Sequence, residues 1–310
     1  MHASNISILL STYNGEKYLK AQLDSLCLQS YTNFTIIARD DGSTDKTVEI
    51  LKSYNVKILP FTKNLGAKGS FAELLSYAVT NTDAKYFMFC DQDDIWQLNK
   101  IEKTLSKMQE MEEIYLQMPV LVHSDLIVVD QNLQILSPSL WNYQNIDPTK
   151  DTLNRLLLHN VVTGCTMMIN RSLAIYVNTM PKETIMHDWW MAMVASSFGQ
   201  ITYLDEPLIL YRQHDKNDTG AKKYNLYNIM RIFLAKIFSG KYKSQLDKYI
   251  LQSRAFLSLY KNDLDEQNKK MLEEFSRFNT ISKWHKIKTL FKYKIWKNGL
   301  LRNLGMVLFV

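Results

Sequence analysis

The run YFMFCDQDDIW, from Tyr86 to Trp96, decides the fold class of this chain. Its first five residues are apolar or aromatic, which predicts a buried β-strand over Tyr86–Cys90. The strand pattern ends abruptly at the carboxylates of Asp91, Asp93 and Asp94. Open α/β sheets bind ligands in this position, outside the carboxyl ends of their strands. The run therefore predicts an α/β fold with a polar site at one edge of the sheet.

The sequence on either side repeats this pattern of short apolar runs that end in polar residues. Further strands are expected at Ile6–Leu10, Phe34–Ala38, Val56–Leu59, Val120–Val129, Val161–Ile169, Ile201–Leu204 and Leu208–Tyr211. Apolar residues at helical spacing predict helices at Tyr18–Gln29, Phe71–Val79 and Asp188–Ser197, with one more helix capped by Ser43 or Thr44. Strands that alternate with helices favour a mainly parallel central sheet.

Charge divides the chain of 310 residues into two parts. Residues 1–220 carry a net charge of −7, whereas residues 221–310 carry a net charge of +13. No strand pattern follows residue 222. We therefore expect an α/β domain over residues 1–220 and a basic helical extension over residues 221–310 that faces something anionic.

The remaining bulk features favour a cytoplasmic protein. Cys27, Cys90 and Cys165 lie far apart without C-x-x-C spacing, so we expect reduced core thiols rather than disulfides or zinc ligands. The first residues lack the basic region of a signal peptide. No run of about 20 apolar residues predicts a membrane span.

Four polar segments follow predicted strands and together predict a binding site. Asp91 and Asp93 stand two residues apart after a strand, where they can share a hard divalent cation. The alternative is a solvated acidic turn that caps a helix starting near Trp96. The other three segments are Ser11–Glu16, Asp40–Asp45 and Asn64–Gly66. An aspartate at such a strand end can accept a hydrogen bond from a base or a ribose, although turn-and-cap chemistry explains the second segment equally well.

The motifs STYNGEKYL, DDGSTD, NLG and DQDDIW, in that order and spacing, resemble the nucleotide-binding half of family 2 glycosyltransferases, which have a GT-A fold. The resemblance continues in TGCTMM (residues 163–168), HDWW (187–190) and YRQHD (211–215). The DQDDIW, HDWW and YRQHD forms are similar to bacterial rhamnosyltransferases of the streptococcal cell-wall polyrhamnose pathway. The specific motifs span about residues 4–220, and the basic tail matches in composition alone.

The resemblance implies a role for individual residues. Residues that would bind the nucleotide-sugar are Thr12, Tyr13, Glu16, Asp41, Asn64, Asp91, Gly164 and Arg212. Asp93 and His214 would hold Mg²⁺ or Mn²⁺, although a lone histidine near a strand end is more often structural. Asp188 would be the catalytic base. Cys165 departs from the family, where glycine is common, which leaves the shape of that pocket open.

The chemistry of glycosyl transfer makes the same demands. The leaving nucleoside diphosphate needs a cation, and the acceptor hydroxyl needs a base. Asp188 stands among aromatic residues that would raise its pKa. One base without a covalent nucleophile predicts a single displacement with inversion. Trp96 and Trp189 are interpreted as an apolar wall for the sugar or the acceptor, next to Asp94, with plain core packing as the alternative.

The expected reaction is transfer of L-rhamnose from dTDP-L-rhamnose to a hydroxyl of a polyprenyl-linked glycan in cell-wall polysaccharide synthesis. A UDP-hexose donor and a non-catalytic nucleotide-sugar-binding protein stay open as alternatives. A nucleotidyltransferase would have a glycine-rich loop after the first strand, which Ser11–Gly15 is not. A processive synthase would need membrane spans.

The tail from Lys283 to Arg302, KWHKIKTLFKYKIWKNGLLR, contains no acidic residue. Its apolar residues Trp284, Ile287 and Phe291 recur at helical spacing between lysines, as does Ile295. This pattern predicts an interfacial helix on the anionic inner face of the cell membrane. A packing helix with a solvated basic face is the alternative. No groove-reading motif supports nucleic-acid binding, and a homodimer through the tail stays open.

Overall fold

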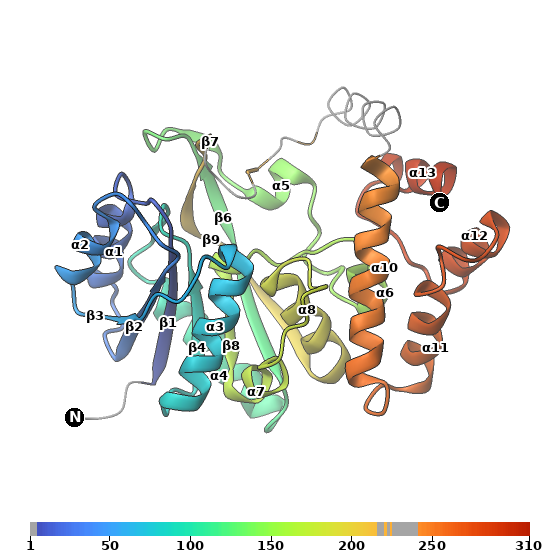
Figure 1. The fold of residues 1–310 in the computed structure, drawn as a ribbon, viewed down its shortest axis with the longest axis horizontal. Helices are drawn as coiled ribbons and strands as arrows, with labels where there is room; N and C mark the ends of the chain where they lie inside the picture. Colours follow the sequence, from blue (N-terminus) through green and yellow to red (C-terminus); the bar gives the residue numbers. More distant parts are fainter. Residues whose placement is uncertain (1–4, 216–219, 222–223, 225–240) are drawn as a thin grey trace.

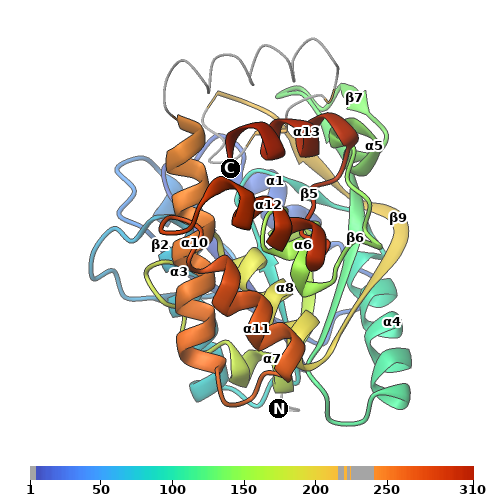
Figure 2. The same cartoon turned by 90° about the vertical axis from the view of Figure 1, so that its right-hand side faces the viewer.

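The structure is a computed structural model that describes residues 5–215, 220, 221, 224 and 241–310. A central sheet runs through the molecule with helices on both faces, and the C-terminal helices gather on one side (Figures 1 and 2). The strand order is β3-β2-β1-β4-β8-β6-β9-β5, and β7 pairs with β6. The expected α/β architecture with a helical C-terminal part is confirmed.

The elements have the following bounds. The strands are β1 Ile6–Thr12, β2 Phe34–Asp40, β3 Val56–Leu59, β4 Tyr86–Cys90, β5 Ile95–Trp96, β6 Val120–Val129, β7 Ile135–Ser137, β8 Met168–Asn170 and β9 Gln200–Arg212. The helices are α1 Leu19–Cys27, α2 Thr47–Lys52, α3 Gly66–Asn81, α4 Lys100–Ile114, α5 Leu140–Gln144, α6 Leu153–Leu156, the short 3-10 helix η1 Gly164–Thr166, α7 Arg171–Tyr176, α8 His187–Phe198, α10 Lys241–Tyr260, α11 Glu266–Phe275, α12 Lys283–Lys292 and α13 Leu300–Phe309.

The first half of the sheet is parallel and places three loops at one edge. β3, β2, β1 and β4 run parallel, with Thr12 opposite Asp40 and Leu10 opposite Cys90. The loops after β1, β2 and β4 therefore leave the sheet side by side. β8 is antiparallel to both β4 and β6, while β6 and β9 are parallel, so the whole sheet is mixed.

Alternating side chains of each strand divide the core into two layers. Ile6, Ile8 and Leu10 of β1 pack in one cluster with apolar residues of α1 and α4. Leu9 points the other way, into a cluster with α3, α8 and the C-terminal helices. Such two-sided burial explains why these strands are continuous apolar runs, as expected for parallel strands covered by helices on both faces.

Three expectations about elements are wrong. The strand expected over Val161–Ile169 is confined to β8, because Gly164–Thr166 forms the turn η1. The two strands expected over 201–211 are one strand, β9, whose pairing with β6 shifts register around Pro207. Helix α2 has no cap from Ser43 or Thr44; Thr47 N donates instead to Asp45 at 3.0 Å.

The C-terminal helices pack on the α/β part rather than standing apart. Phe256 and Tyr260 of α10 contact the Trp190 ring of α8. Buried residues of α11, α12 and α13 belong to the same cluster as Leu9 and Phe87. The boundary predicted near residue 220, and the helical pattern predicted just after it, fall mainly on residues 216–240, most of which lie outside the described residues.

The cysteines are free, and Cys90 and Cys165 are buried as expected. The expectation for Cys27 is wrong, because this residue is exposed at the end of α1. In the described part of the chain, no helix combines the length and the apolarity that crossing a bilayer requires.

Candidate active site

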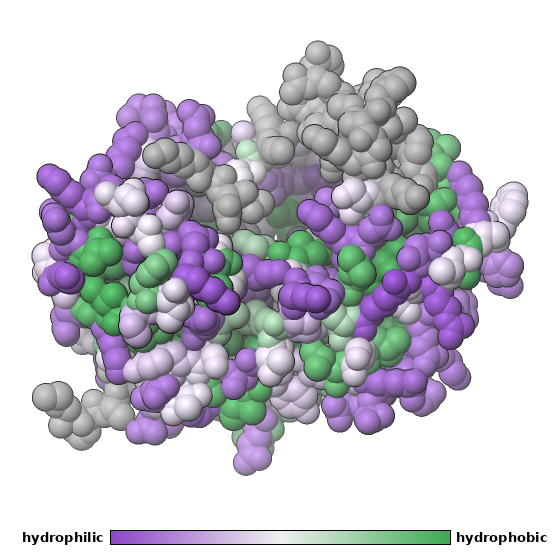
Figure 3. All heavy atoms as spheres, in the orientation of Figure 1, coloured by the Kyte–Doolittle hydropathy of each residue, from purple (hydrophilic) through white to green (hydrophobic). Residues whose placement is uncertain are grey.

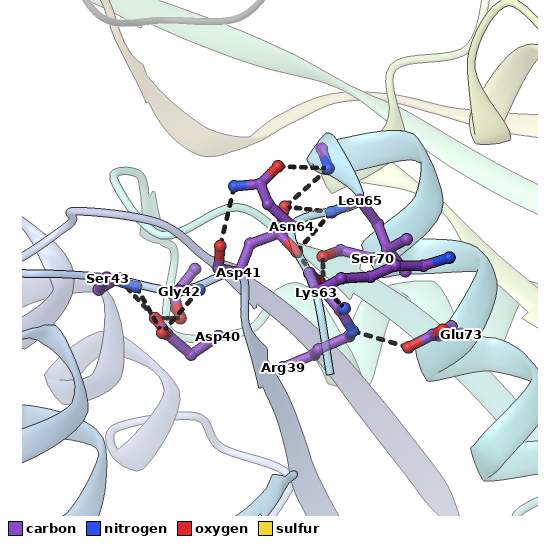
Figure 4. A network of polar contacts seen from close by, with 12 residues as sticks. Arg39, Asp40, Asp41, Gly42, Ser43, Lys63, Asn64, Leu65, Ser70 and Glu73 are labelled. Atoms are coloured by element: carbon purple, nitrogen blue, oxygen red, sulfur yellow. Dashed lines mark hydrogen bonds and ion pairs between the residues drawn. The ribbon is translucent and has the colours of Figure 1, made fainter. Parts of the chain in front are cut away.

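The loop after β2 is organised by the carboxylate of Asp40. It accepts hydrogen bonds from Thr12 Oγ1 at 2.9 Å and from Ser43 Oγ at 2.6 Å. The backbone N–H groups of Gly42 and Ser43 donate to its other oxygen (Figure 4). The hydroxyl of Thr12 is therefore committed to joining β1 to β2, at the edge where the sequence places a nucleotide.

The carboxylate of Asp41 anchors the start of α3. It pairs with the guanidinium of Arg39 and accepts from the backbone N–H of Leu65 at 2.9 Å and of Gly66 at 2.7 Å (Figure 4). Asn64 donates to the backbone oxygen of Asp41 at 2.8 Å. Both predicted nucleotide-binding residues, Asp41 and Asn64, thus hold one loop in shape, and contact with a base stays a prediction.

The loop after β1 is tied to the segment after β2 by hydrogen bonds at three successive residues, Asn14, Gly15 and Glu16. Asn14 N donates to Ser43 Oγ at 2.8 Å, and Gly15 N donates to Thr47 Oγ1 at 2.7 Å. Glu16 accepts from Lys46 N at 3.0 Å through its carboxylate, while Glu16 N donates to Asp45. The two segments therefore form one rigid rim.

Gln92 joins this rim to the acidic loop after β4. Its side chain accepts from Tyr13 N at 2.9 Å and donates to Tyr13 O at 3.0 Å. A Cβ atom at Gly15 would lie 2.2 Å from Gln92 Oε1, so glycine is needed for this contact. The ring of Tyr13 stays 51% exposed, which leaves its face open to a planar ligand.

The predicted metal residues Asp93 and His214 meet, although 121 positions separate them. His214 Nε2 lies 2.7 Å from Asp93 Oδ2. Burial raises the pKa of Asp93, and the hydrogen bond with His214 opposes that rise. The His214 ring stacks on Tyr18, with ring centroids 4.9 Å apart.

Arg212 locks the acidic loop against the end of β9. Its Nε donates to the backbone oxygen of Asp93 at 2.8 Å, and its backbone N–H donates to Asp94 Oδ1 at 3.1 Å. The guanidinium also lies over the Tyr18 ring, 4.6 Å from its centroid. Arg212 thereby holds Asp93 and His214 in register, and its predicted contact with a nucleotide-sugar stays a prediction.

The donor atoms in this loop fit a hard or borderline divalent cation. Asp93 and His214 offer a carboxylate and an imidazole, a set compatible with Mn²⁺. Asp94 is fully buried beside Cys165. Possible ligand atoms of Asp91, Asp94 and Cys165 also lie within 4.8 Å of one another, but a thiol is a poor ligand for Mg²⁺ or Mn²⁺.

The predicted base, Asp188, stands in the first turn of α8. Its Oδ1 accepts from the backbone N–H of Trp189 at 2.6 Å, and its Oδ2 accepts from that of Gly164 at 3.1 Å. Burial raises the pKa of Asp188 to about 6, although these hydrogen bonds and one from Asn160 lower it. The side chain is only partly exposed, so it can meet a substrate while most water is excluded.

The turn η1 connects this base to the acidic loop. Gly164 contacts Asp188, and its neighbour Cys165 lies against Asp91 and Asp94. A Cβ atom at Gly164 would lie 2.8 Å from His187 Nε2, so glycine lets η1 pack closely against α8, and the predicted contact of Gly164 with a nucleotide-sugar stays a prediction. The base and the acidic loop thus flank one short turn. Figure 3 shows this face of the molecule hollowed near its centre, with hydrophilic side chains in the hollow.

The structure does not bring Trp96 and Trp189 together. Trp96 is buried in the cluster with α1 and α4, under the ammonium of Lys100 at 3.8 Å from the ring centroid. Trp189 packs on the opposite cluster, beside Tyr249 of α10. The expectation of a single apolar wall made by both indoles is therefore wrong, and only the partly buried Trp189 adjoins the base.

Comparison with known proteins identifies the family. The model of glycosyl transferase family 2 matches residues 7–176, more than half of the chain. The chain belongs to glycosyl transferase family 2. The structure is also similar to that of TarS from S. aureus in complex with UDP-GlcNAc, with a TM-score of 0.57 and 18% identity over 93% of this chain and 80% of that one. A mannosyltransferase from Pyrobaculum calidifontis, in complex with GDP-Man and Mn²⁺, gives a TM-score of 0.54 at 13% identity, over 94% of this chain and 74% of that one. The fold is therefore GT-A-like.

Relatives within the family carry several names. An uncharacterised glycosyltransferase of Rickettsia typhi is 30% identical over 70% of this chain and 66% of its own length. The dTDP-rhamnosyl transferase RfbG of Shigella flexneri is 27% identical over 72% of this chain and 79% of its own length. An Escherichia coli glucosyltransferase, named for UDP-Glc and α-D-GlcNAc-diphosphoundecaprenol, is 28% identical over 54% of this chain and 61% of its own length. The chain spans less than a third of a Rickettsia bellii relative, 31% of its length.

Sequence reasoning missed four residues that shape this family 2 site: Arg39, Gln92, Asn160 and Tyr18. Arg39 could have been recognised from the sequence, because an arginine inside an otherwise apolar strand needs a buried partner. Gln92 is the one residue of the DQDD motif to which the sequence analysis assigned no role. Asn160 contacts Asp188, and Tyr18 contacts His214. Each contact joins segments that are distant in the sequence, so no local pattern predicts it.

Proposed function

We propose that this chain transfers L-rhamnose from dTDP-L-rhamnose to a hydroxyl of a lipid-linked glycan, with inversion and with help from a divalent cation. The observation that carries the proposal is the arrangement around η1. The Asp93–His214 pair belongs to the acidic loop, which lies against Cys165 of the turn, and Asp188 is hydrogen-bonded to Gly164 of the same turn. A leaving group and an acceptor hydroxyl need these two kinds of residue on opposite sides of a sugar.

Asp93 and His214 are the residues that would hold the cation. When bound, Mn²⁺ or Mg²⁺ would act as a Lewis acid that stabilises the charge growing on the leaving diphosphate. Arg212 orients this pair through Asp93 and stacks on Tyr18. Tyr13, exposed at the rim, would stack on the base, and Glu16, Asp91 and Gly164 would contact the nucleotide-sugar.

Asp188 would take the proton of the acceptor hydroxyl. The raised pKa of about 6 suits this role, because a stronger base accepts a proton more readily and still stays ionised near neutral pH. The N–H groups of Gly164 and Trp189 aim the carboxylate and leave it little freedom to rotate. With one base and no second carboxylate placed as a nucleophile among the assigned residues, the displacement is direct and inverts the anomeric carbon.

The rhamnosyl donor is favoured by the motifs shared with bacterial rhamnosyltransferases and by the likeness to RfbG. A UDP-hexose is the alternative, since the relative from Escherichia coli is named for UDP-Glc. The same relative's name supports a diphospho-lipid acceptor, which would keep the enzyme at the inner face of the cell membrane.

Helices α12 and α13 present a face suited to that membrane. Trp284 is 81% exposed and Phe291 63% exposed, one above the other on α12. Leu300, Leu304 and Leu308 are exposed at four-residue spacing on α13. Lys283 of α12 donates to the backbone oxygen of Leu308 at 2.6 Å, which joins the two helices. Exposed apolar side chains among lysines fit an anionic bilayer interface.

A donor panel tests the proposal. Nucleoside diphosphate release is measured from dTDP-L-rhamnose, UDP-glucose and UDP-GlcNAc, with and without Mn²⁺, for the wild type and for Asp93→Ala. Release from dTDP-L-rhamnose that needs both Mn²⁺ and Asp93 is the expected result. Release from a UDP-hexose alone would overturn the rhamnosyl donor, and release from none would favour a non-catalytic nucleotide-sugar-binding protein.

A further inference from the structure

Four basic side chains from distant segments gather beside the candidate base. Arg155 lies in the last turn of α6 and His159 follows this helix, while Lys297 and Arg302 come from the C-terminal part, before and within α13. Burial lowers the pKa of His159 to about 3, and the charges of Arg302, Lys297 and Arg155 add to this shift. These four residues are called the basic cluster below.

The cations of the basic cluster contact neutral groups. Arg155 donates to the backbone oxygen of Lys297 and to Asn298 Oδ1, both at 3.2 Å. Lys297 Nζ donates to the Tyr249 hydroxyl at 3.2 Å, and Arg302 donates to the backbone oxygens of Asn298 and Gln144. Within the described ranges, none of the three forms a salt bridge with a carboxylate, in contrast to Arg39 with Asp41.

The carboxylate of Asp147, whose charge acts on the basic cluster, is already bonded to other groups. The charge of Asp147 acts on Arg155. Its carboxylate, however, accepts from Thr149 N and Thr149 Oγ1 and pairs with Lys150 at 3.6 Å. The three cations are half-buried, and a counter-charge stabilises a cation that is partly shielded from water. Among the described residues, no carboxylate forms a salt bridge with any of them.

Polar side-chain atoms in and beside the basic cluster are also left over. Within the described residues, Arg155 Nε, His159 Nε2 and Nδ2 of the neighbouring Asn298 are buried without a hydrogen-bond partner. A buried polar group without a partner destabilises the folded protein. Unused donors next to uncompensated cations point to a ligand with several negatively charged oxygens.

Two sets of contacts connect the basic cluster to Asp188, one through Asn160 and one through Trp189. His159 is followed by Asn160, which hydrogen-bonds Asp188. Trp189, the residue after the base, donates through Nε1 to the backbone oxygen of Leu156 in α6 at 2.6 Å, and its ring lies tilted against that of Tyr249, with centroids 5.6 Å apart. Lys297 also lies over the Tyr249 ring, at 4.9 Å from its centroid. The acidic loop, by comparison, reaches Asp188 through η1.

We propose that the basic cluster binds the phosphate or diphosphate group of the acceptor substrate. This inference rests on the proposed function, since it assumes that an acceptor approaches Asp188. Arginine side chains bind phosphate oxygens through two parallel N–H bonds, and a diphosphate offers the charge that three cations require. The site would fix the distance between the anionic end of the acceptor and the hydroxyl that attacks.

Equilibrium binding of geranyl diphosphate to the full-length protein in EDTA tests the inference. Chelation removes any cation from the Asp93–His214 pair, so diphosphate binding at the donor site loses its metal bridge. The wild type is expected to bind geranyl diphosphate and not geraniol. Lys297→Gln should weaken binding at least about 10-fold, and Lys297→Arg should restore it to within about 3-fold. Lys294→Gln, which removes an exposed lysine three positions away, is the matched control and should bind as the wild type does.

Several results would overturn the inference. Equal binding by Lys297→Gln and the wild type would remove the basic cluster from the site, and equal binding of geraniol would show a contact with the apolar chain only. Loss of binding in Asp93→Ala would assign the diphosphate to the donor site. Arg302→Gln serves as the second variant if Lys297→Gln does not fold. Because release of nucleoside diphosphate from the donor needs no acceptor, intact release without geranyl diphosphate binding refutes this inference alone, and the opposite result refutes the proposed function alone.

Discussion

The backbone N–H of Gly164 donates to Oδ2 of Asp188 at 3.1 Å, across 24 residues of sequence. Through this bond the candidate base is held by the same turn whose next residue, Cys165, lies against Asp91 and Asp94. The position of the base relative to the acidic loop is thus fixed by backbone atoms. A glycine is required there because a Cβ atom would collide with His187.

The rate of transfer is predicted to rise with pH through a value near 6. Burial raises the pKa of Asp188 to about 6, and a base acts only when it is deprotonated, so activity is lost as the pH falls through that value. An ordinary aspartate would already be ionised at pH 5. Single-turnover transfer at saturating donor and Mn²⁺, measured between pH 5 and 8, checks this. A flat profile over that range, with unchanged donor binding, would contradict it.

His214→Ala is predicted to weaken metal binding and to leave the protein folded. Removing one ligand should raise the Mn²⁺ concentration for half-maximal activity by at least about 10-fold. His285→Ala, which removes an exposed histidine of α12, is the matched control and should leave it unchanged. The two titrations with Mn²⁺ are compared at saturating donor. A normal Mn²⁺ dependence in His214→Ala would remove this residue from the metal site.

Gly15→Ala and Gln92→Ala are predicted to weaken nucleotide binding by the same amount. Their effects are not expected to add in the double variant. A methyl group at residue 15 would displace the Gln92 side chain, which then loses both bonds to Tyr13. Each single variant should weaken nucleotide binding by roughly 1–2 kcal/mol, and the double variant by no more than either. Calorimetric titration with dTDP measures all three. Additive losses would show that Gly15 acts through something other than Gln92.

The double variant Trp284→Ser/Phe291→Ser is predicted to lose binding to anionic vesicles. Two exposed aromatic side chains on one face of α12 contribute to interfacial binding, and the surrounding lysines add about 1 kcal/mol each. Flotation with vesicles containing phosphatidylglycerol should fall at least about 10-fold. Leu116→Ser, which changes a side chain 76% exposed after α4, is the control. Equal flotation of the double variant and the wild type would contradict a membrane role for α12.

Local patterns were sufficient to predict the parallel half of the sheet. The strand Tyr86–Cys90 was predicted with its observed bounds, because five apolar residues end at a sharp polar boundary. The segment before β8 was mistaken for strand because its apolar residues belong to a turn packed on α8, and packing between distant segments leaves no periodic signal. For the same reason the break expected at Pro207 is a register shift inside β9.

Some contacts of the candidate site were predicted from the sequence, and others were not. The contact between Asp93 and His214 was inferred from the resemblance, and the structure brings the two side chains together. The roles of Asp41 and Asn64 as anchors for α3 were not foreseen, because the Arg39 partner lies inside a strand and its ion pair depends on the tertiary fold. Trp96 and Trp189 look alike in sequence, yet the sheet places them in opposite layers of the core.

The most direct test of the account compares Asp188→Asn with the wild type in two measurements on the same protein: binding of the donor and transfer to the acceptor. Asparagine keeps the size of the side chain but cannot take a proton. If Asp188 is the base, Asp188→Asn binds the donor within about 3-fold of the wild-type affinity, and its rate of transfer falls at least about 100-fold. Transfer at a rate near that of the wild type would show that another group removes the proton, and the central assignment of Asp188 would be wrong.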